Sequence, residues 1–384
     1  MILLLIGHRD APLVFGLTVL ERHVRAVRKA GFDPQALIVE AAPSLDLPDR
    51  IDHVPVKRAE GARLAEIVAD EAPVLLLEAN SIVDWRLIAQ LGAAGKPAIA
   101  RDGGGFCAFL SDSRAFAGAT IAETLAALPA FTQEDFRGFI AKLRRTQPFY
   151  ILPARNEDDR SKAERFLFWS NYKGSTDLFT RYVYPPLVWL LLRPLARLRV
   201  DPNIVTWISV ALTLLAVPLF ALGHFTLGFI CAYGMSVLDS VDGKLARLTF
   251  ADSKFGHYLD HGLDVIHPPL WYFAWAIGLA RLSHHDALPA VAALLCLFYV
   301  MDRLILLIYP TLYGRGLHNH ARIDALLRAI IARRNINLPL FTAGYYLGVG
   351  EPVYFLILFW TMATCLYHGL RTVYVVTLDP PRLA

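Results

Sequence analysis

The sequence predicts an α/β soluble domain followed by an all-α membrane domain, and three observations support this division. The chain of 384 residues is 55% hydrophobic, only 19% charged and has a mean hydropathy of +0.42, which is too apolar for an ordinary soluble enzyme. Charges occur throughout residues 1–175, whereas long apolar runs begin at Val183. Near the N-terminus, strand-like and helix-like segments alternate. We therefore expect an α/β domain over 1–145, a linker and interfacial helix over 146–200, and a six-helix domain over 201–384.

The N-terminal pattern is strand, amphipathic helix, strand. "ILLLIG" and "ALIVE" are strand-like, and between them Leu20, Val24 and Val27 share one helical face that ends at Gly31. A second series follows, with helices over 61–72 and 84–95 and strands over 73–79 and 97–101. Such alternation favours a mostly parallel sheet covered by helices, in which the apolar N-terminus is a buried strand and not a signal peptide.

Three other features carry little functional signal. The glycine-rich "RDGGGFCAF" lacks the spacing of a phosphate-binding loop, so we expect a surface turn there. The four cysteines include no CxxC pair and predict neither a disulfide nor a zinc site. With a net charge of +4 and no interleaved basic and aromatic tracts, the chain is not expected to bind nucleic acid.

The membrane domain is expected to begin with a helix in the headgroup layer. Residues 180–200 combine Tyr, Trp and Leu with four arginines and three prolines, which is typical of an interfacial amphipathic helix. Beyond it, the apolar spans lie at about 204–223, 225–247, 257–281, 287–312, 337–350 and 352–378. Basic residues flank the first span and the loop before the fifth, which predicts that these loops and the soluble domain are cytoplasmic. The aromatics of "WYFAW" at 271–275 are expected to face lipid or the interface.

Four aspartates stand in this otherwise lipid-compatible region. Asp239, Asp242 and Ala246 lie on one helical face, and Gly256, Asp260 and Asp264 repeat that stripe on the next helix. Each charge at bilayer depth costs roughly 3 kcal/mol or more. Four converging carboxylates would also repel one another unless cations intervene, and oxygen ligands suit Mg²⁺ or Mn²⁺. The sequence therefore predicts a divalent metal site.

Small residues beside the acids predict what shares that site. Gly243, Ala246 and Gly256 would let a ligand approach the helix backbone, and Arg247 offers a planar cation suited to phosphate oxygens. A metal-bound diphosphate fits this pattern better than a bare ion or proton.

These residues form a motif that resembles a known family. The pattern Asp-x-x-Asp-Gly-x-x-Ala-Arg from Asp239, followed after eight residues by Gly-x-x-x-Asp-x-x-x-Asp ending at Asp264, is similar at every fixed position to the signature of the CDP-alcohol phosphotransferase (CDP-alcohol phosphatidyltransferase) family. "DPNIVTWIS" at 201–209 also resembles that family's Pro-Asn-x-x-Thr entry to its first helix, and six helices is its usual number.

The resemblance implies a transfer in which an acceptor alcohol attacks the β-phosphate of a CDP-alcohol and CMP departs. It implies two divalent cations, Mg²⁺ or Mn²⁺, with Asp264 also acting as the base that takes the acceptor's proton. The implied metal ligands are Asp239, Asp242, Asp260 and Asp264. The implied substrate-binding residues are Gly243, Ala246, Arg247 and Gly256, with Asn203 and Thr206 at the cytidine end.

The N-terminal region has a resemblance of its own. Residues 12–39 are similar to the early part of sugar-phosphate nucleotidyltransferases, although only "GHRDA" stands where that family has its glycine-rich loop. The family's second metal-binding carboxylate would fall on Asn80, so a nucleotidyltransferase-like domain without catalysis is expected. The order of the two parts resembles an inositol-phosphate cytidylyltransferase fused to a di-myo-inositol phosphate phosphate synthase. This order suggests an inositol phosphate or similar polyol phosphate as acceptor, and CDP-diacylglycerol or a soluble CDP-polyol as donor.

The expected protein is thus a multi-pass enzyme of phospholipid or polar-head biosynthesis in a prokaryotic inner membrane, in contact with membrane lipids and homodimeric. Two alternatives stay open: an N-terminal domain that is an active cytidylyltransferase, and an ion or solute transporter with intramembrane carboxylates. His257 and His261 are alternative metal ligands or bases. A later basic set is open to acceptor binding or to positive-inside anchoring: Arg303, Arg315, His318, His320, Arg322, Arg333 and Arg334.

Overall fold

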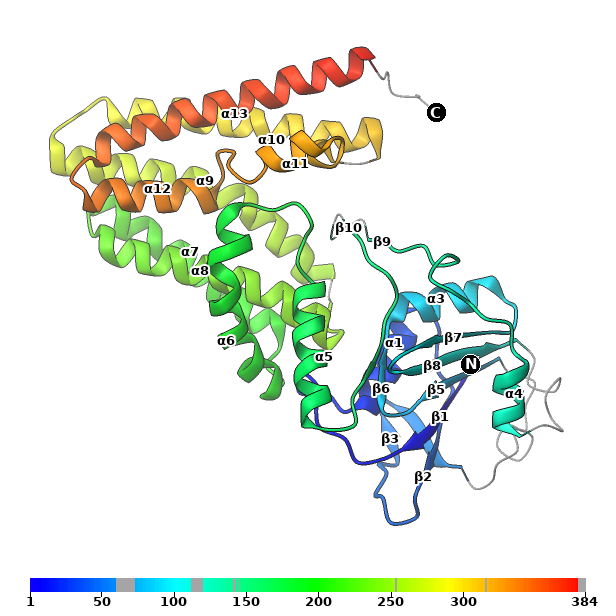
Figure 1. Ribbon diagram of the computed structural model, residues 1–384. Coiled ribbons are helices and arrows are strands. Elements are labelled where there is room, and N and C mark those ends of the chain that lie inside the picture. The colour runs from blue at the N-terminus through cyan, green and yellow to red at the C-terminus, as the bar shows by residue number, and fades with distance from the viewer. Residues whose placement is uncertain are drawn as a thin grey trace. The chain divides into compact units, whose positions relative to one another are not determined.

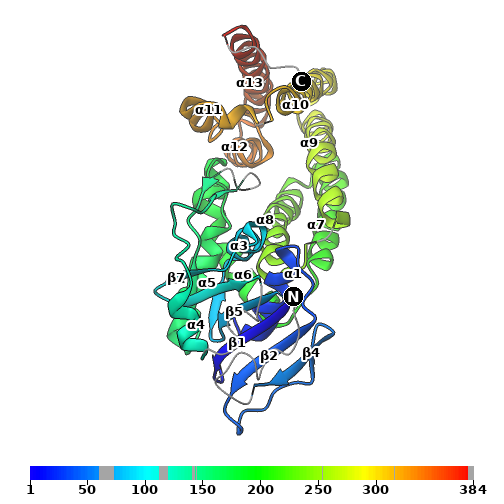
Figure 2. The ribbon, with the colours of Figure 1, turned by 90° about the vertical axis from the view of Figure 1, so that its right-hand side faces the viewer.

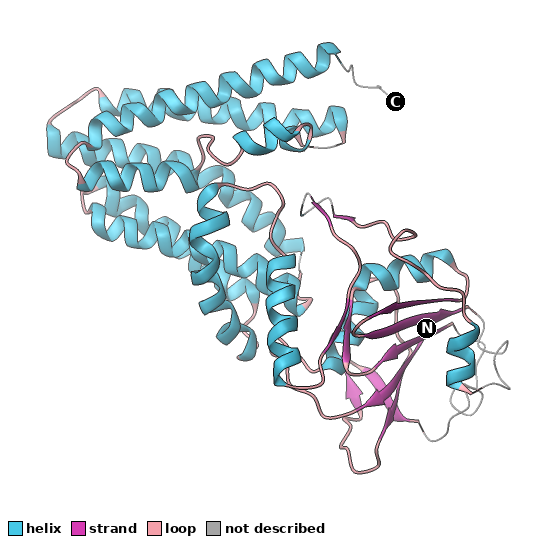
Figure 3. Ribbon diagram, viewed as in Figure 1, coloured by secondary structure: helices cyan, strands magenta, loops and turns pink. Residues whose placement is uncertain are grey.

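The computed structural model describes residues 1–59, 73–111, 120–140, 143, 145–252, 254–314 and 316–378. Within α9 (Lys254–Ser283), the described side chains are those of residues 265–283. The chain forms two compact units. The first comprises Met1–Tyr172, Ala196–Arg199 and Arg247–Phe250, and the second comprises Lys173–Leu195, Val200–Ala246 and Ala251–Ala384. All described strands belong to the first unit (Figure 3).

The first unit is built on a seven-stranded sheet of order β3-β4-β2-β1-β5-β8-β7. Its strands are β1 (Ile2–His8), β2 (Ala36–Ala41), β3 (Arg50–Ile51), β4 (Val54–Arg58), β5 (Val74–Glu78), β7 (Ala98–Asp102) and β8 (Gly105–Leu110). The centre, β4-β2-β1-β5, is parallel, but β3, β8 and β7 join antiparallel. The sheet is therefore mixed and not mostly parallel as expected.

The alternation of side chains along the strands gives the sheet two buried faces. Leu3 and Leu5 face one cluster with α1 (Val19–Lys29) and α3 (Trp85–Ala94). Ile2 and Leu4 face the other, which α4 (Ile121–Ala127) covers (Figure 1). The helix expected over 61–72 lies outside the described residues.

The glycine-rich segment is a β-hairpin turn, as expected. Asp102 pairs with Gly105 across it, and a two-residue connection forces β7 and β8 to run antiparallel. A Cβ on Gly104 would lie 2.0 Å from the carbonyl oxygen of Ile151, so close backbone approach requires glycine there. That neighbour belongs to β11 (Ile151–Pro153), which pairs with β6 (Ser81–Val83). β9 (Phe139–Ile140) and β10 (Arg145–Thr146) form a small hairpin before α5 (Glu157–Ser170).

The second unit is helical. A π-helix over Phe179–Val183 leads into α6 (Tyr184–Arg197), and six further helices occupy the expected spans: α7 (Pro202–Ala221), α8 (Phe225–Thr249), α9, α10 (Leu288–Tyr313), α12 (Arg334–Tyr346) and α13 (Gly350–Leu378). A short 3₁₀ turn (Leu317–Asn319) and α11 (Arg322–Leu327) connect α10 to α12. Figure 2 shows α7 beside α9 and α10 beside α13, two pairs that are in contact.

Three described helices are long and apolar enough to cross a membrane: α7, α10 and α13. α8 is a continuous helix, but the charged residues of the motif make its second half less apolar. α12 has only 13 residues, which is about 20 Å at 1.5 Å per residue. The chain is thus a membrane protein, while the count of six spans and the interfacial position of α6 stay predictions.

The core of the second unit is aromatic. Trp271, Tyr272 and Trp275 of α9 are each 1% exposed and pack among Phe220, Phe341 and other rings. The expectation that 271–275 faces lipid is therefore wrong for these three. Positions 271, 272 and 275 fall on one side of a helix with 3.6 residues per turn, and only Phe273 lies on the outer side.

Candidate active site

The first half of the acidic motif lies on α8. Asp239, Asp242, Gly243 and Ala246 follow one another along the second half of this continuous helix, as the spacing predicts. Asp242 is only 6% exposed, and its Oδ1 accepts from the main-chain N–H of Gly243. A carboxylate buried to this extent needs further partners.

The start of α7 supplies one of them. Asp201 caps this helix by accepting from the N–H of Asn203 at 2.8 Å, and Pro202 occupies the first helical position. One turn later the buried hydroxyl of Thr206 donates to Asp242 Oδ2 at 2.6 Å. The fold therefore brings Thr206 from the "DPNIVT" segment to a predicted metal ligand of the motif.

The start of α12 supplies a cation to the other acid. Arg334 Nη2 lies 2.8 Å from Asp239 Oδ2. The same guanidinium contacts the sulfur of Met235 at 3.2 Å and His267 Nε2 at 3.3 Å. Arg334 belongs to the basic set noted in the sequence, but only the tertiary structure pairs it with Asp239.

The second half of the motif is described by its main chain alone. Gly256, Asp260 and Asp264 fall at four-residue intervals within α9, so these three positions lie on one face of that helix. The side chains of Asp260 and Asp264, and of His257 and His261, lie outside the described residues.

The described acids fit a hard divalent cation. They offer carboxylate oxygens only, and Asp239 already accepts from a positively charged group. Among the described side chains, no group of three or more potential metal ligands is found. A full ligand set would need Asp260 and Asp264 in addition.

Arg247, the last residue of the α8 half of the motif, has a fixed orientation. Its Nε–H donates to Asn171 Oδ1 at 3.0 Å. Asn171 follows the last turn of α5 and donates in turn from Nδ2 to the carbonyl of Leu167 at 2.8 Å.

Comparison with known proteins agrees with the motif. Residues 199–372 match the family model of CDP-alcohol phosphatidyltransferase. This region is therefore a CDP-alcohol phosphatidyltransferase domain. The chain is also 41% identical over 87 residues to archaetidylinositol phosphate synthase of Pyrococcus horikoshii, which is 22% of this chain and 46% of the relative. The chain thus spans about half the length of the curated relative that it matches.

A solved structure is similar to part of the chain. The phosphatidylinositol phosphate synthase of Mycobacterium tuberculosis, with CDP-DAG bound, is 18% identical with a TM-score of 0.39. That match covers 50% of this chain and 93% of the solved chain.

The CDP-alcohol phosphatidyltransferase domain contains buried ionic groups that the motif did not reveal. Asp302 of α10 accepts from Arg303 and contacts His368 Nδ1 of α13, both at 2.5 Å. Asp324 of α11 is fully buried and accepts from Tyr367 and, through both oxygens, from Arg371. An aspartate within an apolar span such as 287–312 is the sequence signal that could have indicated the first pair.

A third polar group joins the segment before α6 to α12. Buried Asp177 accepts from the main chain and hydroxyl of Thr180, each at 2.8 Å, and Asn335 donates to Asp177 at 3.3 Å and to Thr180 at 2.9 Å. Asn335 directly follows Arg334, so these bonds help to fix the start of α12 beside Asp239.

The N-terminal region is not covered by the family match. Asn80 lies at the carboxyl ends of β1 and β5, where α/β sheets commonly bind ligands. Its Oδ1 accepts from the N–H of Arg9 at 3.1 Å, its Nδ2 donates to the carbonyl of Arg9 at 3.0 Å, and His8 Nδ1 lies 3.0 Å from the same Oδ1. Nearby, Glu78 accepts from Arg155 at 2.6 Å. The side chain of Asn80 is thus committed to holding the loop after β1.

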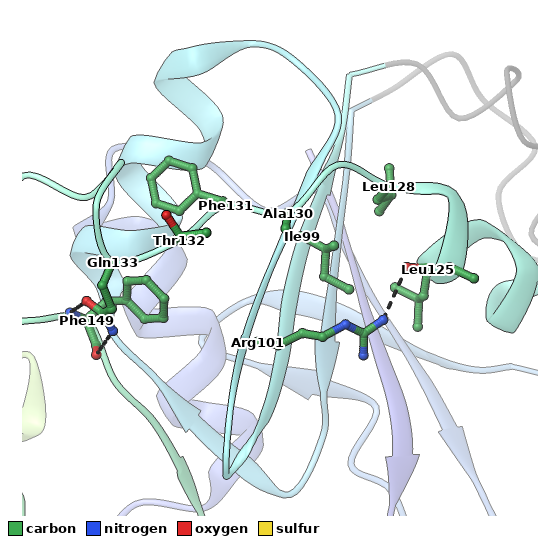
Figure 4. Close-up of a pocket in the computed structure, with 10 residues that line it drawn as sticks. Ile99, Arg101, Leu125, Leu128, Ala130, Phe131, Thr132, Gln133 and Phe149 are labelled. Carbon is green, nitrogen blue, oxygen red and sulfur yellow. Dashed lines mark hydrogen bonds between the residues drawn. The ribbon is translucent and has the colours of Figure 1, made fainter.

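A cavity of about 360 Å³ lies elsewhere in this unit. Figure 4 shows its mostly apolar wall, which includes Ile99, Leu125 and Phe131, and Arg101 donating to the carbonyl of Leu125. None of the site residues expected from the sequence lines this cavity.

Proposed function

We propose that the protein is an integral membrane CDP-alcohol phosphotransferase that transfers a phosphatidyl or phospho-alcohol group from a CDP-alcohol to an acceptor alcohol and releases CMP. The observation that carries this proposal is the family match over residues 199–372, which contains every fixed position of the acidic motif. The contacts of Asp242 with Thr206 and of Asp239 with Arg334 support it, because they fix the two described acids.

In the proposed reaction, the acceptor hydroxyl attacks the β-phosphate, its proton passes to Asp264, and the bond to CMP breaks with the electron pair leaving on CMP. Two divalent cations, held by Asp239, Asp242, Asp260 and Asp264, would polarise the diphosphate and neutralise the leaving group. Gly243, Ala246 and Gly256 would leave room for the nucleotide, Arg247 would contact its phosphates, and Asn203 and Thr206 would lie at the cytidine end.

An inositol phosphate or similar polyol phosphate is the proposed acceptor. The support is the 41% identity to a relative named archaetidylinositol phosphate synthase, over a stretch that is 46% of that protein. We further propose a homodimer in a prokaryotic inner membrane, with the N-terminal unit in the cytoplasm and without catalysis of its own. The commitment of Asn80 to the backbone of Arg9 supports the last point.

The test is CMP release by detergent-solubilised protein with Mg²⁺ or Mn²⁺, using CDP-diacylglycerol and a panel of acceptors that includes inositol phosphate. A transporter would release no CMP and would move an ion or solute in liposomes instead. An active N-terminal cytidylyltransferase would make a CDP-alcohol from CTP, which we do not expect.

The assignment of the base has its own test. We expect Asp264→Asn to keep the fold and donor binding but to abolish CMP release, because an amide cannot accept the proton. Calorimetric binding of the CDP-alcohol and the melting temperature serve as controls, and normal turnover in this variant would refute the role of Asp264.

A further inference from the structure

The last turn of the motif helix belongs to the first compact unit. Residues Arg247–Phe250 group with Met1–Tyr172, although the rest of α8 belongs to the second unit. The end of α8 is therefore part of the same compact unit as α1 and α5.

Two arginines of α1 bind the end of this helix. Arg22 Nη1 donates to the carbonyl of Leu248 at 3.1 Å, and Arg25 Nη1 donates to the carbonyl of Thr249 at 2.9 Å. The last four carbonyls of a helix have no partners within it and carry partial negative charge, so guanidinium groups are suitable caps. These two bonds satisfy two of those carbonyls.

The surroundings of Arg22 show that this cap is built into the unit. Arg22 is 4% exposed, donates also to the carbonyl of Val14 at 3.2 Å, and lies 5.5 Å from the centre of the Phe250 ring. Phe250 ends the helix with a φ of 57° and packs against the core of the first unit. The Nε–H of Arg25 donates to Asp52 Oδ2 at 2.8 Å, which fixes the guanidinium beside the helix end.

The first unit also orients the side chain of Arg247, the first residue of this turn. Arg247 Nε donates to Asn171 Oδ1 at 3.0 Å, and Asn171 is itself tied to Leu167. A guanidinium has five N–H donors, and this bond fixes the plane in which the others lie.

We propose that Asn171, Arg22 and Arg25 are positioning residues: they fix the last turn of α8 and aim Arg247 at the phosphates of the CDP-alcohol. The three positioning residues belong to the same compact unit as the turn that they hold. The kinetic part of this inference rests on the proposed function, whereas the capping of α8 does not.

Hydrogen exchange of the full-length protein in detergent tests the capping. We expect Arg25→Ala to speed amide exchange at residues 247–251 about tenfold or more, since it removes the bond to Thr249. The matched control is Arg28→Ala, which removes an arginine one turn along α1 that donates to the carbonyl of Asp52 and not to α8. Equal exchange in Arg25→Ala and Arg28→Ala would overturn the capping.

Steady-state kinetics test the aiming of Arg247. We expect Asn171→Ala to raise the KM for the CDP-alcohol about tenfold with kcat within about twofold and the KM for the acceptor unchanged. Asn171→Asp retains the oxygen that accepts from Arg247 and should restore the wild-type KM. If Asn171 had only a structural role, both variants would have a lower melting temperature and would not differ from each other in the KM for the CDP-alcohol.

The possible outcomes distinguish a failure of the positioning role from a failure of the proposed function. Wild-type protein that releases CMP together with an unchanged KM in Asn171→Ala would overturn the positioning role and leave the proposed function intact. Wild-type protein that releases no CMP from any CDP-alcohol would refute the proposed function, and the exchange experiment would still decide the capping.

Discussion

The hydroxyl of Thr206 is the smallest feature on which the proposed metal site depends. It donates to Asp242 at 2.6 Å within a buried environment, so it fixes one carboxylate oxygen and directs the lone pairs of the other. A motif of aspartates in a sequence gives no information on such a partner, because the donor comes from a different helix.

We expect Thr206→Val to raise the Mg²⁺ concentration for half-maximal CMP release by about 10-fold or more, as is typical when a group that orients a metal ligand is removed. Valine matches threonine in shape, so the fold should persist. Thr206→Ser keeps the hydroxyl and is the control, expected to behave as wild type. An unchanged Mg²⁺ requirement in the valine variant would show that Thr206 does not orient Asp242.

Arg334 neutralises Asp239 in this structure, and a bound divalent cation would do the same. Without either, Asp239 would carry an uncompensated charge in a mostly buried site. We expect Arg334→Gln to lower the melting temperature in EDTA and to increase the rise in melting temperature on addition of Mg²⁺. Arg322→Gln, at an exposed arginine of α11, is the control. A Mg²⁺ response equal to wild type would indicate that no cation binds at Asp239.

At the scale of single elements, α1 has a buried face that includes a titratable group. His23 is 1% exposed, and its Nε2 lies 3.2 Å from the carbonyl of Ala79. Burial, together with the charges of His8 and Arg22, lowers the pKa of His23 to about 4, although the hydrogen bond to Ala79 opposes this. The folded protein therefore keeps His23 neutral at a pH where the unfolded chain binds a proton.

This shift makes the first unit sensitive to acid. Because the folded pKa lies below the unfolded value of 6.5, stability is full above pH 6.5 and falls as the pH drops toward about 4. Between pH 7.5 and 5.0 the loss from His23 should be about 2 kcal/mol. We expect His23→Gln, whose amide can donate to Ala79, to lose correspondingly less stability over this interval in denaturant titrations of the full chain. An identical pH dependence in the two proteins would contradict this.

The helices of the second unit are joined by ionic contacts as well as by aromatic packing. Asp302 and His368 connect α10 to α13, and Asp324 and Arg371 connect α11 to α13. Burial by itself would raise the pKa of Asp324, but the hydrogen bonds from Arg371 and Tyr367 together with the charge of Arg371 outweigh it, so the pKa is lowered. The stabilisation from this contact is therefore present above the ordinary carboxyl pKa of about 3.9 and is lost only in stronger acid.

On the scale of the whole molecule, the distribution of basic residues predicts how the chain crosses the membrane. The predicted cytoplasmic side holds the N-terminal region and the start of α7, so the turn at His224 between α7 and α8 should lie on the opposite side. His224 and Lys57 are both exposed, and Cys107, Cys231 and Cys365 are buried.

We expect a membrane-impermeant maleimide to label His224→Cys in intact cells and to label Lys57→Cys only after lysis. The wild-type protein, whose remaining thiol at Cys296 is half-buried within α10, is the background control. Labelling of Lys57→Cys in intact cells would place the N-terminal unit outside and contradict the predicted orientation.

The sequence by itself determined the division into an α/β and a helical part, the strand and helix pattern of residues 2–41, and the acidic motif. Local periodicity and fixed spacing along one helix encode all of these. The sequence did not determine that β8 and β7 join the sheet antiparallel, because strand order depends on pairings between distant segments. Nor did apolar composition tell lipid-facing aromatics from buried ones, since neighbouring helices decide which face of α9 is covered.

Only the tertiary structure decided the partners of the motif. Thr206 meets Asp242, Arg334 meets Asp239 and Asn171 meets Arg247 across sequence separations of 36, 95 and 76 residues. Spacing along one helix fixes which side chains share a face. What stands opposite that face follows from how the helices pack, and packing depends on contacts that no local pattern contains.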